Sequence, residues 1–178
     1  MAGGLASGVA QAAALLDVTG PHLAYLIRHA HAGDRAAWRG DDSLRPLSDK
    51  GRRQAEAIAA RLAPPPPLGR VLSSPSLRCV QTVEPLAGAA GRAVETEERL
   101  LEGADAHEAL ALLDEAIRDG AMAACTHGDI VPGVLELLRS RGVRIAGPLT
   151  WPKGSTWVLE GADGDGVVAA RYLPPPSL

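Results

Sequence analysis

Two kinds of hydrophobic pattern alternate along most of the chain. Short apolar runs rich in strand-forming residues are followed by longer stretches whose apolar residues recur every three or four positions. Strands are predicted at 22–27, 70–73, 93–96 and 121–126. Helices are predicted at 48–62, 77–90, 106–119 and 130–141. This alternation predicts an α/β fold, with a mostly parallel sheet and helices on both of its faces.

Polar and turn-forming residues mark where several helices begin and end. Ser48 is the expected N-cap of the first helix. Pro85 predicts an interruption of the second helix, and Gly142 is expected to close the fourth. The prolines at 64–67 predict a stiff connector after the first helix.

The end of the chain has a different pattern. Two apolar segments, 155–160 and 167–173, flank a Gly- and Asp-rich stretch at 161–166. Strand-forming runs separated by such residues predict a C-terminal hairpin.

Length and composition predict one ordinary globular domain. The chain has 178 residues, of which 46% are hydrophobic and 22% charged. We expect the domain to span 21–178, after an Ala/Gly-rich tail at 1–20 that is disordered or loosely helical. Because no Lys or Arg precedes Arg28, the tail does not fit a secretory signal. No apolar run is long enough to span a bilayer, so the expected location is the cytoplasm without a membrane partner.

Charge and cysteine content narrow the function further. A formal net charge of -3 argues against a nucleic acid polymer as the partner. The two cysteines, Cys79 and Cys125, do not form a disulfide framework, and we expect both to be small buried residues. The oligomeric state is not predicted.

Arginine and histidine recur where predicted strands give way to helices. Arg28 and His29 follow the first strand, Arg78 lies in the first turns of the second helix, and His127 follows the strand at 121–126. In open α/β sheets, ligands bind just beyond the carboxyl ends of the strands. This recurrence predicts an anion pocket at the edge of a parallel sheet.

The same motifs resemble those of the histidine phosphatase (phosphoglycerate mutase-like) superfamily. The resemblance covers roughly 22–173 and rests on Arg-His-Ala at 28–30, Ser-Ser-Pro at 73–75 with Arg78, Gln-Thr at 81–82, and Thr-His-Gly at 126–128. The segment 42–47 looks most like the small bacterial phosphohistidine phosphatases. That segment and 153–157 also resemble the phosphatase half of actinobacterial fusions with a Nudix hydrolase.

The resemblance implies a phosphoglycerate mutase-like fold and a metal-independent phosphatase without a cofactor. His29 is the implied nucleophile, which forms a covalent phosphohistidine. Arg28, Arg78 and His127 would bind the phosphate with it. For His29 to attack, one ring nitrogen must be unprotonated while an acceptor, expected from the backbone, holds the N–H of the other.

Glu102 is the candidate general acid, because the resemblance implies a carboxylate after the third strand. Asp105 is the runner-up, and the alternative for Glu102 is a solvated side chain in an acidic run. Asp129 follows His127 by two residues, where we expect it to cap the next helix.

Four further residues are candidates for the rim of the pocket. They are His31, Arg35, Trp38 and Arg45. The pair His29 and His31 also suggests a metal site, but few aspartates lie near it in the sequence, and no metal is expected.

The substrate class stays open between a phosphohistidine-bearing protein and a phosphorylated small molecule, such as a nucleotide or a sugar phosphate. A basic rim with stacking by Trp38 would favour nucleotides. The alternative of another class is a non-catalytic module that binds phosphate or a phosphoprotein. Mutase activity is not expected, because the loop before Glu102 lacks a long lid.

Overall fold

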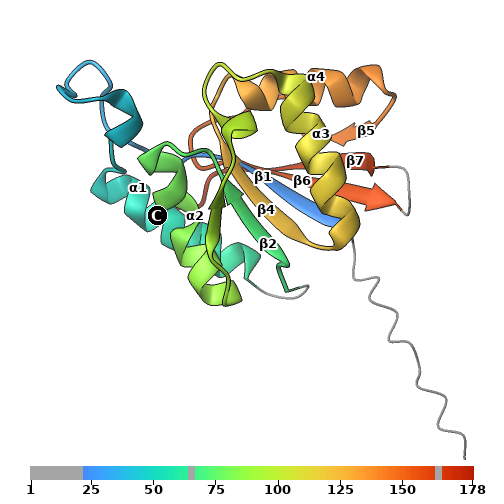
Figure 1. The fold of residues 1–178 in the computed structure, drawn as a ribbon, viewed down its shortest axis with the longest axis horizontal. Coiled ribbons are helices and arrows are strands. Elements are labelled where there is room, and N and C mark those ends of the chain that lie inside the picture. The colour runs from blue at the N-terminus through green and yellow to red at the C-terminus, as the bar shows by residue number, and fades with distance from the viewer. Residues whose placement is uncertain (1–21, 64–66, 163–165) are drawn as a thin grey trace, which may run out of the picture.

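A computed structural model describes residues 22–63, 67–162 and 166–178 (Figure 1). The predicted tail at 1–20 lies outside the described residues, as do most of the proline connector and the tip of the hairpin turn. The tail and the domain boundary therefore stay predictions.

Within the described residues, one seven-stranded sheet has the order β3-β2-β4-β1-β6-β7-β5. The strands are β1 (Leu23–Arg28), β2 (Arg70–Ser73), β3 (Val94–Thr96), β4 (Met122–Thr126), β5 (Arg144–Ala146), β6 (Thr156–Ala162) and β7 (Gly166–Leu173). From β3 to β1 the neighbours are parallel. Strand β6 is antiparallel to β1 and to β7, so β6 and β7 form the predicted C-terminal hairpin.

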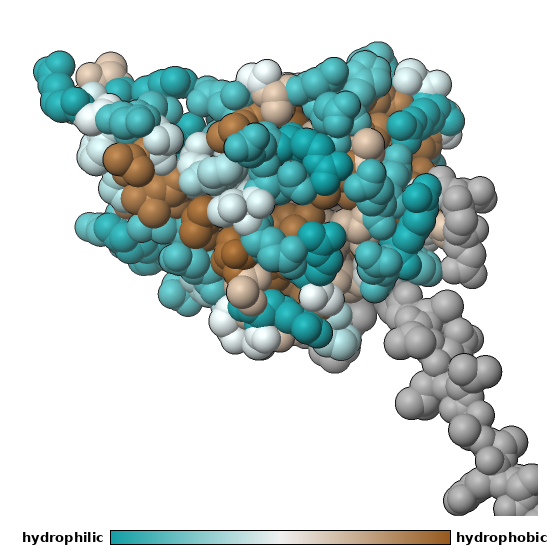
Figure 2. Space-filling model, in the orientation of Figure 1, coloured by the Kyte–Doolittle hydropathy of each residue, from teal (hydrophilic) through white to brown (hydrophobic). Residues whose placement is uncertain are grey.

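Four α-helices cover the two faces of the sheet, two on each (Figure 1). They are α1 (Asp49–Leu62), α2 (Leu77–Ala90), α3 (Ala106–Ala116) and α4 (Ile130–Ser140). Alternate residues of β1 divide between two cores: Tyr25 and Ile27 pack with α1 and α2, and Ala24 and Leu26 with α3 and α4. The predicted α/β fold is confirmed. In the same view, hydrophilic residues cover much of the surface and apolar residues show between them (Figure 2).

The structure differs from the predicted helices and strands in two places. Helix α2 continues through Pro85 to Ala90. A proline removes one backbone hydrogen bond, but Val83 and Leu86 on either side are fully buried, and their packing holds the helix together. Strand β5 was not predicted, because it has three residues and only its middle residue, Ile145, is partly buried.

The start of α1 is tied to the loop after β1. Ser48 caps α1 as predicted, with Oγ accepting from the Gly51 N–H at 3.2 Å. The Ser48 N–H donates to the carbonyl of His31 at 3.0 Å. A Cβ at position 51 would overlap that carbonyl, so the close approach requires Gly51. This packing fixes the loop that follows the predicted nucleophile.

Candidate active site

The parallel strands bring the predicted residues to one edge of the sheet. Arg28 at the end of β1 is in register with Thr126 at the end of β4, and the His29 N–H donates to the Thr126 carbonyl at 3.0 Å. His127 therefore follows β4 beside His29, and their ring centroids are 5.4 Å apart. Arg78 reaches the same edge from the first turn of α2. His29, Arg78 and His127 are each at most 5% exposed.

His29 is held with one ring nitrogen available for attack. Its Nδ1 lies 2.8 Å from the carbonyl oxygen of Ala30. Because a carbonyl only accepts, Nδ1 carries the hydrogen in this bond and Nε2 of the neutral ring has a free electron pair. Burial lowers the pKa of His29 to about 3, against the pull of the Ala30 carbonyl and with help from His127 and the two arginines. The ring is neutral over the physiological range, and the expected backbone acceptor is present.

His127 is fixed through both ring nitrogens. Nδ1 lies 3.3 Å from Nη2 of Arg78, which only donates. Nε2 lies 2.8 Å from Oγ of Ser74, a buried hydroxyl that accepts its hydrogen. The Sγ of Cys79 is 3.5 Å from the same Nε2. These contacts orient the His127 ring at the sheet edge.

The two cysteines are buried, as predicted. Cys79 does not only fill space in the core, however, because it contacts His127. Burial raises the pKa of the Cys79 thiol, but hydrogen bonds with Cys125 and His127 outweigh it and lower the pKa to about 6. In the sequence, the position of Cys79 directly after Arg78 was the signal that it could lie at the site.

Arg78 is the most connected side chain of the site. Its Nη1 donates to the Asp42 carbonyl at 2.7 Å, and Nη2 lies 3.0 Å from Oε2 of Glu102 and 3.2 Å from Oδ2 of Asp42. Its Nε is buried and has no protein partner among the described residues. Two carboxylates and His127 thus aim the guanidinium into the site.

Arg28 lies against the Thr-His-Gly turn. Its Nη1 donates to the carbonyl of Trp151 at 2.8 Å, and its buried Nε has no partner in the part of the chain that the structure describes. A Cβ at Gly128 would lie 2.6 Å from the guanidinium carbon. The glycine of the motif makes room for Arg28. Burial lowers the pKa of Arg28, while the charges of Asp129 and Glu102 raise it.

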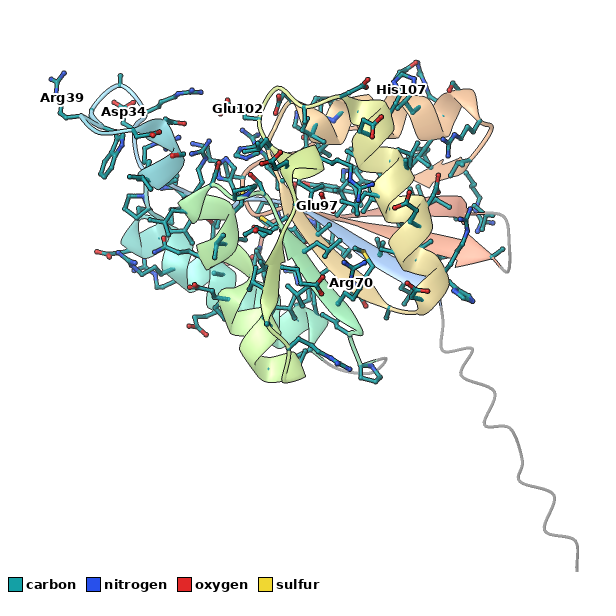
Figure 3. The ribbon with its side chains drawn as sticks, in the orientation of Figure 1. Asp34, Arg39, Arg70, Glu97, Glu102 and His107 are labelled. Carbon is teal, nitrogen blue, oxygen red and sulfur yellow. The ribbon has the colours of Figure 1, made fainter. Side chains whose placement is uncertain are left out.

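Three carboxylates singled out in the sequence, Glu102, Asp105 and Asp129, lie in different places. Glu102 is at the site, between Arg78 and Arg35, whose Nη1 is 2.9 Å from Oε1 (Figure 3). Asp105 instead caps α3 and pairs with His107 at 3.1 Å, at an exposed position. Asp129 occupies the N-cap position of α4 but its side chain makes no capping bond. Its carboxylate accepts from the Gly103 N–H at 2.7 Å and fastens the loop that carries Glu102.

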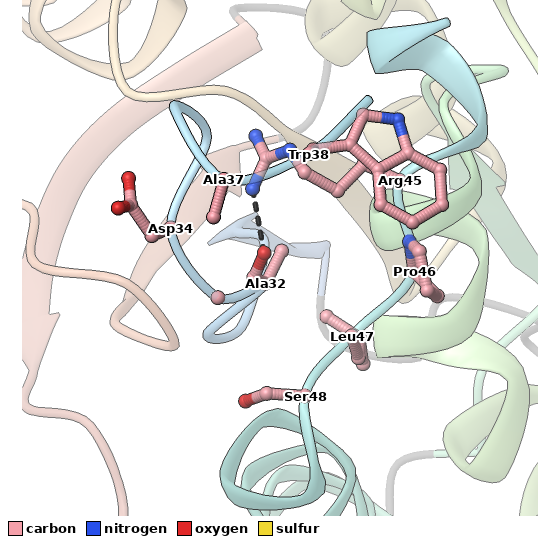
Figure 4. A pocket seen from close by; sticks show the side chains of 9 residues that line it. Ala32, Asp34, Ala37, Trp38, Arg45, Pro46, Leu47 and Ser48 are labelled. Atoms are coloured by element: carbon pink, nitrogen blue, oxygen red, sulfur yellow. Dashed lines mark hydrogen bonds between the residues drawn. The ribbon is translucent and has the colours of Figure 1, made fainter. Parts of the chain in front are cut away.

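Two of the four predicted rim residues, Trp38 and Arg45, line an open hollow next to this cluster (Figure 4). The hollow has a volume of about 240 Å³, and its lining includes Ala37, Trp38, Arg45 and Leu47. Arg45 is buried, with Nη1 donating to the Ala32 carbonyl. Trp38 is 38% exposed.

His31 and Arg35 lie beside the hollow without lining it. The Nδ1 of His31 is 2.7 Å from Oγ of Ser48. The side chain of Arg35 is 63% exposed and pairs with Glu102 and Asp42.

Two charged residues of the site were missing from the predicted set. Asp42 forms ion pairs with Arg35, Arg45 and Arg78 at 3.5, 2.8 and 3.2 Å. Lys153 lies close enough to Arg28, Arg45 and Arg78 for their charges, after burial, to lower its pKa. Both residues lie in the segments 42–47 and 153–157 that resemble known phosphatases, and this was the only sequence signal for them.

Among the described residues there is neither a cluster that could hold a metal ion nor a helix that could cross a membrane. Across 22–63, 67–162 and 166–178, no three His, Cys, Asp or Glu side chains gather so as to hold a metal ion. In the same ranges, no helix is both long and apolar enough to cross a membrane.

Comparison with known proteins agrees with the motifs. The model of the histidine phosphatase superfamily (branch 1) matches residues 24–104. An 8-oxo-(d)GTP phosphatase of Mycolicibacterium smegmatis is 40% identical over 157 residues, which are 85% of this chain and 48% of that protein. The chain therefore spans about half of this relative's length.

Solved structures share the fold. The protein histidine phosphatase SixA complexed with tungstate superposes with a TM-score of 0.67 at 19% identity, covering 85% of this chain and 94% of that one. A putative phosphohistidine phosphatase SixA from Agrobacterium tumefaciens gives 0.61 at 26% identity, covering 79% and 92%. Residues 24–104 and the motif residues gathered at one sheet edge are thus similar to the histidine phosphatase superfamily.

Proposed function

We propose that this protein is a phosphatase that works through a covalent phosphohistidine on His29. The observation that carries the proposal is the environment of the His29 ring. Its Nδ1–H is bound by the Ala30 carbonyl, so the neutral Nε2 is free to attack at a site lined by Arg28, Arg78 and His127. A nucleophile with a free electron pair beside two guanidinium groups suits phosphoryl transfer.

The first step is the attack of Nε2 on phosphorus. The N–P bond forms as the bond from phosphorus to the leaving group breaks. Arg28 and Arg78 stabilise the charge on the phosphoryl oxygens, which is the main task of a protein in this chemistry. Water then attacks the phosphohistidine, and the N–P electron pair returns to Nε2 with release of inorganic phosphate.

Glu102 is proposed as the general acid for poor leaving groups. Of the two candidate acids, Glu102 and Asp105, Glu102 is the one that contacts Arg78, at 3.0 Å. A bound phosphate competes with Glu102 for the same guanidinium nitrogen. The carboxylate released from Arg78 can then take up a proton from solvent and, beside the leaving-group oxygen, deliver that proton to it.

The comparisons support this proposal at two levels. Similarity to the superfamily over residues 24–104 and the named phosphatase activity of the 40% identical relative favour phosphate hydrolysis. The tungstate complex of a protein with the same fold favours an oxyanion site. The substrate is a separate matter: the SixA structures favour phosphohistidine, and the 8-oxo-(d)GTP phosphatase favours a nucleotide.

The test uses p-nitrophenyl phosphate and the variant His29→Ala. The wild type should release p-nitrophenol and, when quenched during turnover with a ³²P-labelled substrate, should retain acid-labile, hydroxylamine-sensitive label. The variant should lose both while keeping the circular dichroism spectrum of the wild type. An unchanged rate in the variant contradicts the assignment of His29. A folded wild type that binds vanadate without turnover would instead be a phosphate-binding module.

A further inference from the structure

The cations of the site differ in how they are balanced. Arg78 is paired with Asp42 and Glu102, and Arg45 is paired with Asp42. Within the described residues, neither Arg28 nor Lys153 has a carboxylate at ion-pair distance. Lys153 is half-buried. Burial lowers its pKa most, the charges of Arg28, Arg45 and Arg78 lower it further, and the charge of Asp34 raises it. Such a group is stabilised when an anion binds between the charges.

The backbone holds Lys153 next to the nucleophile. The N–H of Gly154 donates to the carbonyls of both Arg28 and His29, at 3.1 Å each. Gln54 bridges from the other side: its Oε1 accepts from the His31 N–H at 2.9 Å, and its Nε2 donates to the Lys153 carbonyl at 3.5 Å. The loops of His31 and Lys153 are therefore fastened together. The backbone of Lys153 therefore has a fixed position beside the nucleophile.

The charges felt by the two histidines differ, and Lys153 is among those that act on His31. The pKa of His29 is lowered by burial and by His127, Arg78 and Arg28. After burial, the groups that lower the pKa of His31 are Lys153, Lys50 and Arg45. The charge of Lys153 thus acts on His31 and Arg45 as well as on Arg28 and Arg78 of the phosphate cluster.

The hollow has an apolar wall. Its lining joins the indole of Trp38 to Ala37, Pro46 and Leu47, and the guanidinium of Arg45 lies among them (Figure 4). The site therefore combines the phosphate cluster, Lys153, and an open pocket with an aromatic ring. A phosphate, a second anionic group and a planar ring make a nucleoside diphosphate.

We propose that Lys153 binds a second phosphate and that the substrate is a phosphoanhydride, a nucleoside diphosphate whose ring lies in the hollow. This inference rests on the proposed function of His29. The terminal phosphorus is transferred to Nε2 as its bond to the bridging oxygen breaks. The electron pair stays on that oxygen, and the nucleoside monophosphate leaves with its charge stabilised by Lys153. Water then releases inorganic phosphate, and the proton of the water passes to solvent.

The experiment compares three probes: GDP, GMP and p-nitrophenyl phosphate. The wild type should have a higher kcat/KM for GDP than for GMP. In Lys153→Met, kcat/KM for GDP should fall roughly 10- to 100-fold, the value of a charge-assisted contact. The fall for p-nitrophenyl phosphate should be at least about tenfold smaller, since that probe has no second phosphate. Lys153→Arg should recover most of the GDP activity.

Arg144 provides the control, because it is an exposed cation in β5, an edge strand of the sheet. Arg144→Met should have the kinetics of the wild type. Equal losses on all three probes in Lys153→Met would mean that Lys153 only supports the His29 loop, and would overturn the proposal. A wild type that turns over p-nitrophenyl phosphate but does not prefer GDP to GMP overturns it as well. Absence of turnover on every probe would instead count against the proposed function.

Discussion

The inner cluster and the outer hollow are built in opposite ways. His29 follows β1, His127 follows β4, and Arg78 lies in the first turn of α2. All three side chains are buried, and Arg78 contacts His127. The His29 N–H donates to the backbone of β4. The hollow is lined by residues of 32–48 alone. Some of its bonds are local, such as that from Nε1 of Trp38 to the Asp41 carbonyl, and one, from the Leu47 N–H to Oε1 of Gln81, reaches α2. The cluster is therefore fixed by the whole sheet, whereas one segment of loop can change the hollow. This division separates the chemistry from the choice of substrate.

Removing Arg78 should have the largest effect on the cluster. Arg78→Ala is expected to lower kcat/KM for p-nitrophenyl phosphate by roughly 10³- to 10⁵-fold, the range for an arginine that stabilises a transferring phosphoryl group. It also leaves Asp42 and Glu102 to repel the phosphate. Steady-state kinetics with a circular dichroism check measure the loss. Arg70→Ala is the control, because Arg70 pairs with Glu95 on the surface and should leave kcat/KM unchanged. Near-wild-type activity in Arg78→Ala would mean that the cluster does not bind phosphate.

Glu102 joins the two regions and should affect only difficult leaving groups. Glu102→Gln is expected to slow an alkyl phosphate by about 10²–10⁴-fold, as loss of a general acid does. p-Nitrophenyl phosphate and phosphohistidine should be spared, because their leaving groups need no strong proton donor. The measurement is the rate at which the wild type and the variant hydrolyse each of the three substrates. A uniform loss would assign Glu102 to the shape of the site, through its bond to Arg78, rather than to proton transfer.

The buried His29 should make stability depend on pH. Its pKa is about 3 in the folded chain and about 6.5 when exposed. Between these values the unfolded chain binds the extra proton, so the free energy of unfolding falls as the pH falls from 6.5 toward 3. The slope from this group is at most about 1.4 kcal/mol per pH unit. Urea unfolding of the wild type and of His29→Gln across this range should differ by that slope. Parallel curves would contradict a buried neutral His29.

The hollow should give the smallest and most selective effect. Trp38→Ala is expected to raise KM for a nucleotide by roughly tenfold, a typical loss for one stacked base. The KM for p-nitrophenyl phosphate should change by less than about twofold, because its small ring stays near the cluster. Leu44→Ala serves as the control, since Leu44 is 61% exposed and does not line the hollow. Equal changes in both substrates would show that Trp38 only supports the loop.

The sequence was most informative where one residue type and one spacing decide the structure. Arg28, His29 and His127 could be predicted because each follows an apolar strand, and parallel strands end at a common edge. Lys153 and Asp42 could not, because their place depends on how distant loops pack, through bonds such as that of Gln54 to the Lys153 carbonyl. The predicted interruption at Pro85 was wrong for a similar reason: packing of α2 against the sheet outweighs the local preference.

The position of β1 has a consequence for when the site exists. β1 carries the nucleophile at its end, yet both of its neighbours in the sheet, β4 and β6, come about a hundred residues later. A chain growing from the ribosome presents His29 first and Arg78 next, while β1 still lacks any partner strand. Pairings between such distant segments form slowly, because a long loop must close before they stabilise anything. His29 therefore meets His127 only after β4 has been synthesised and has paired with β1.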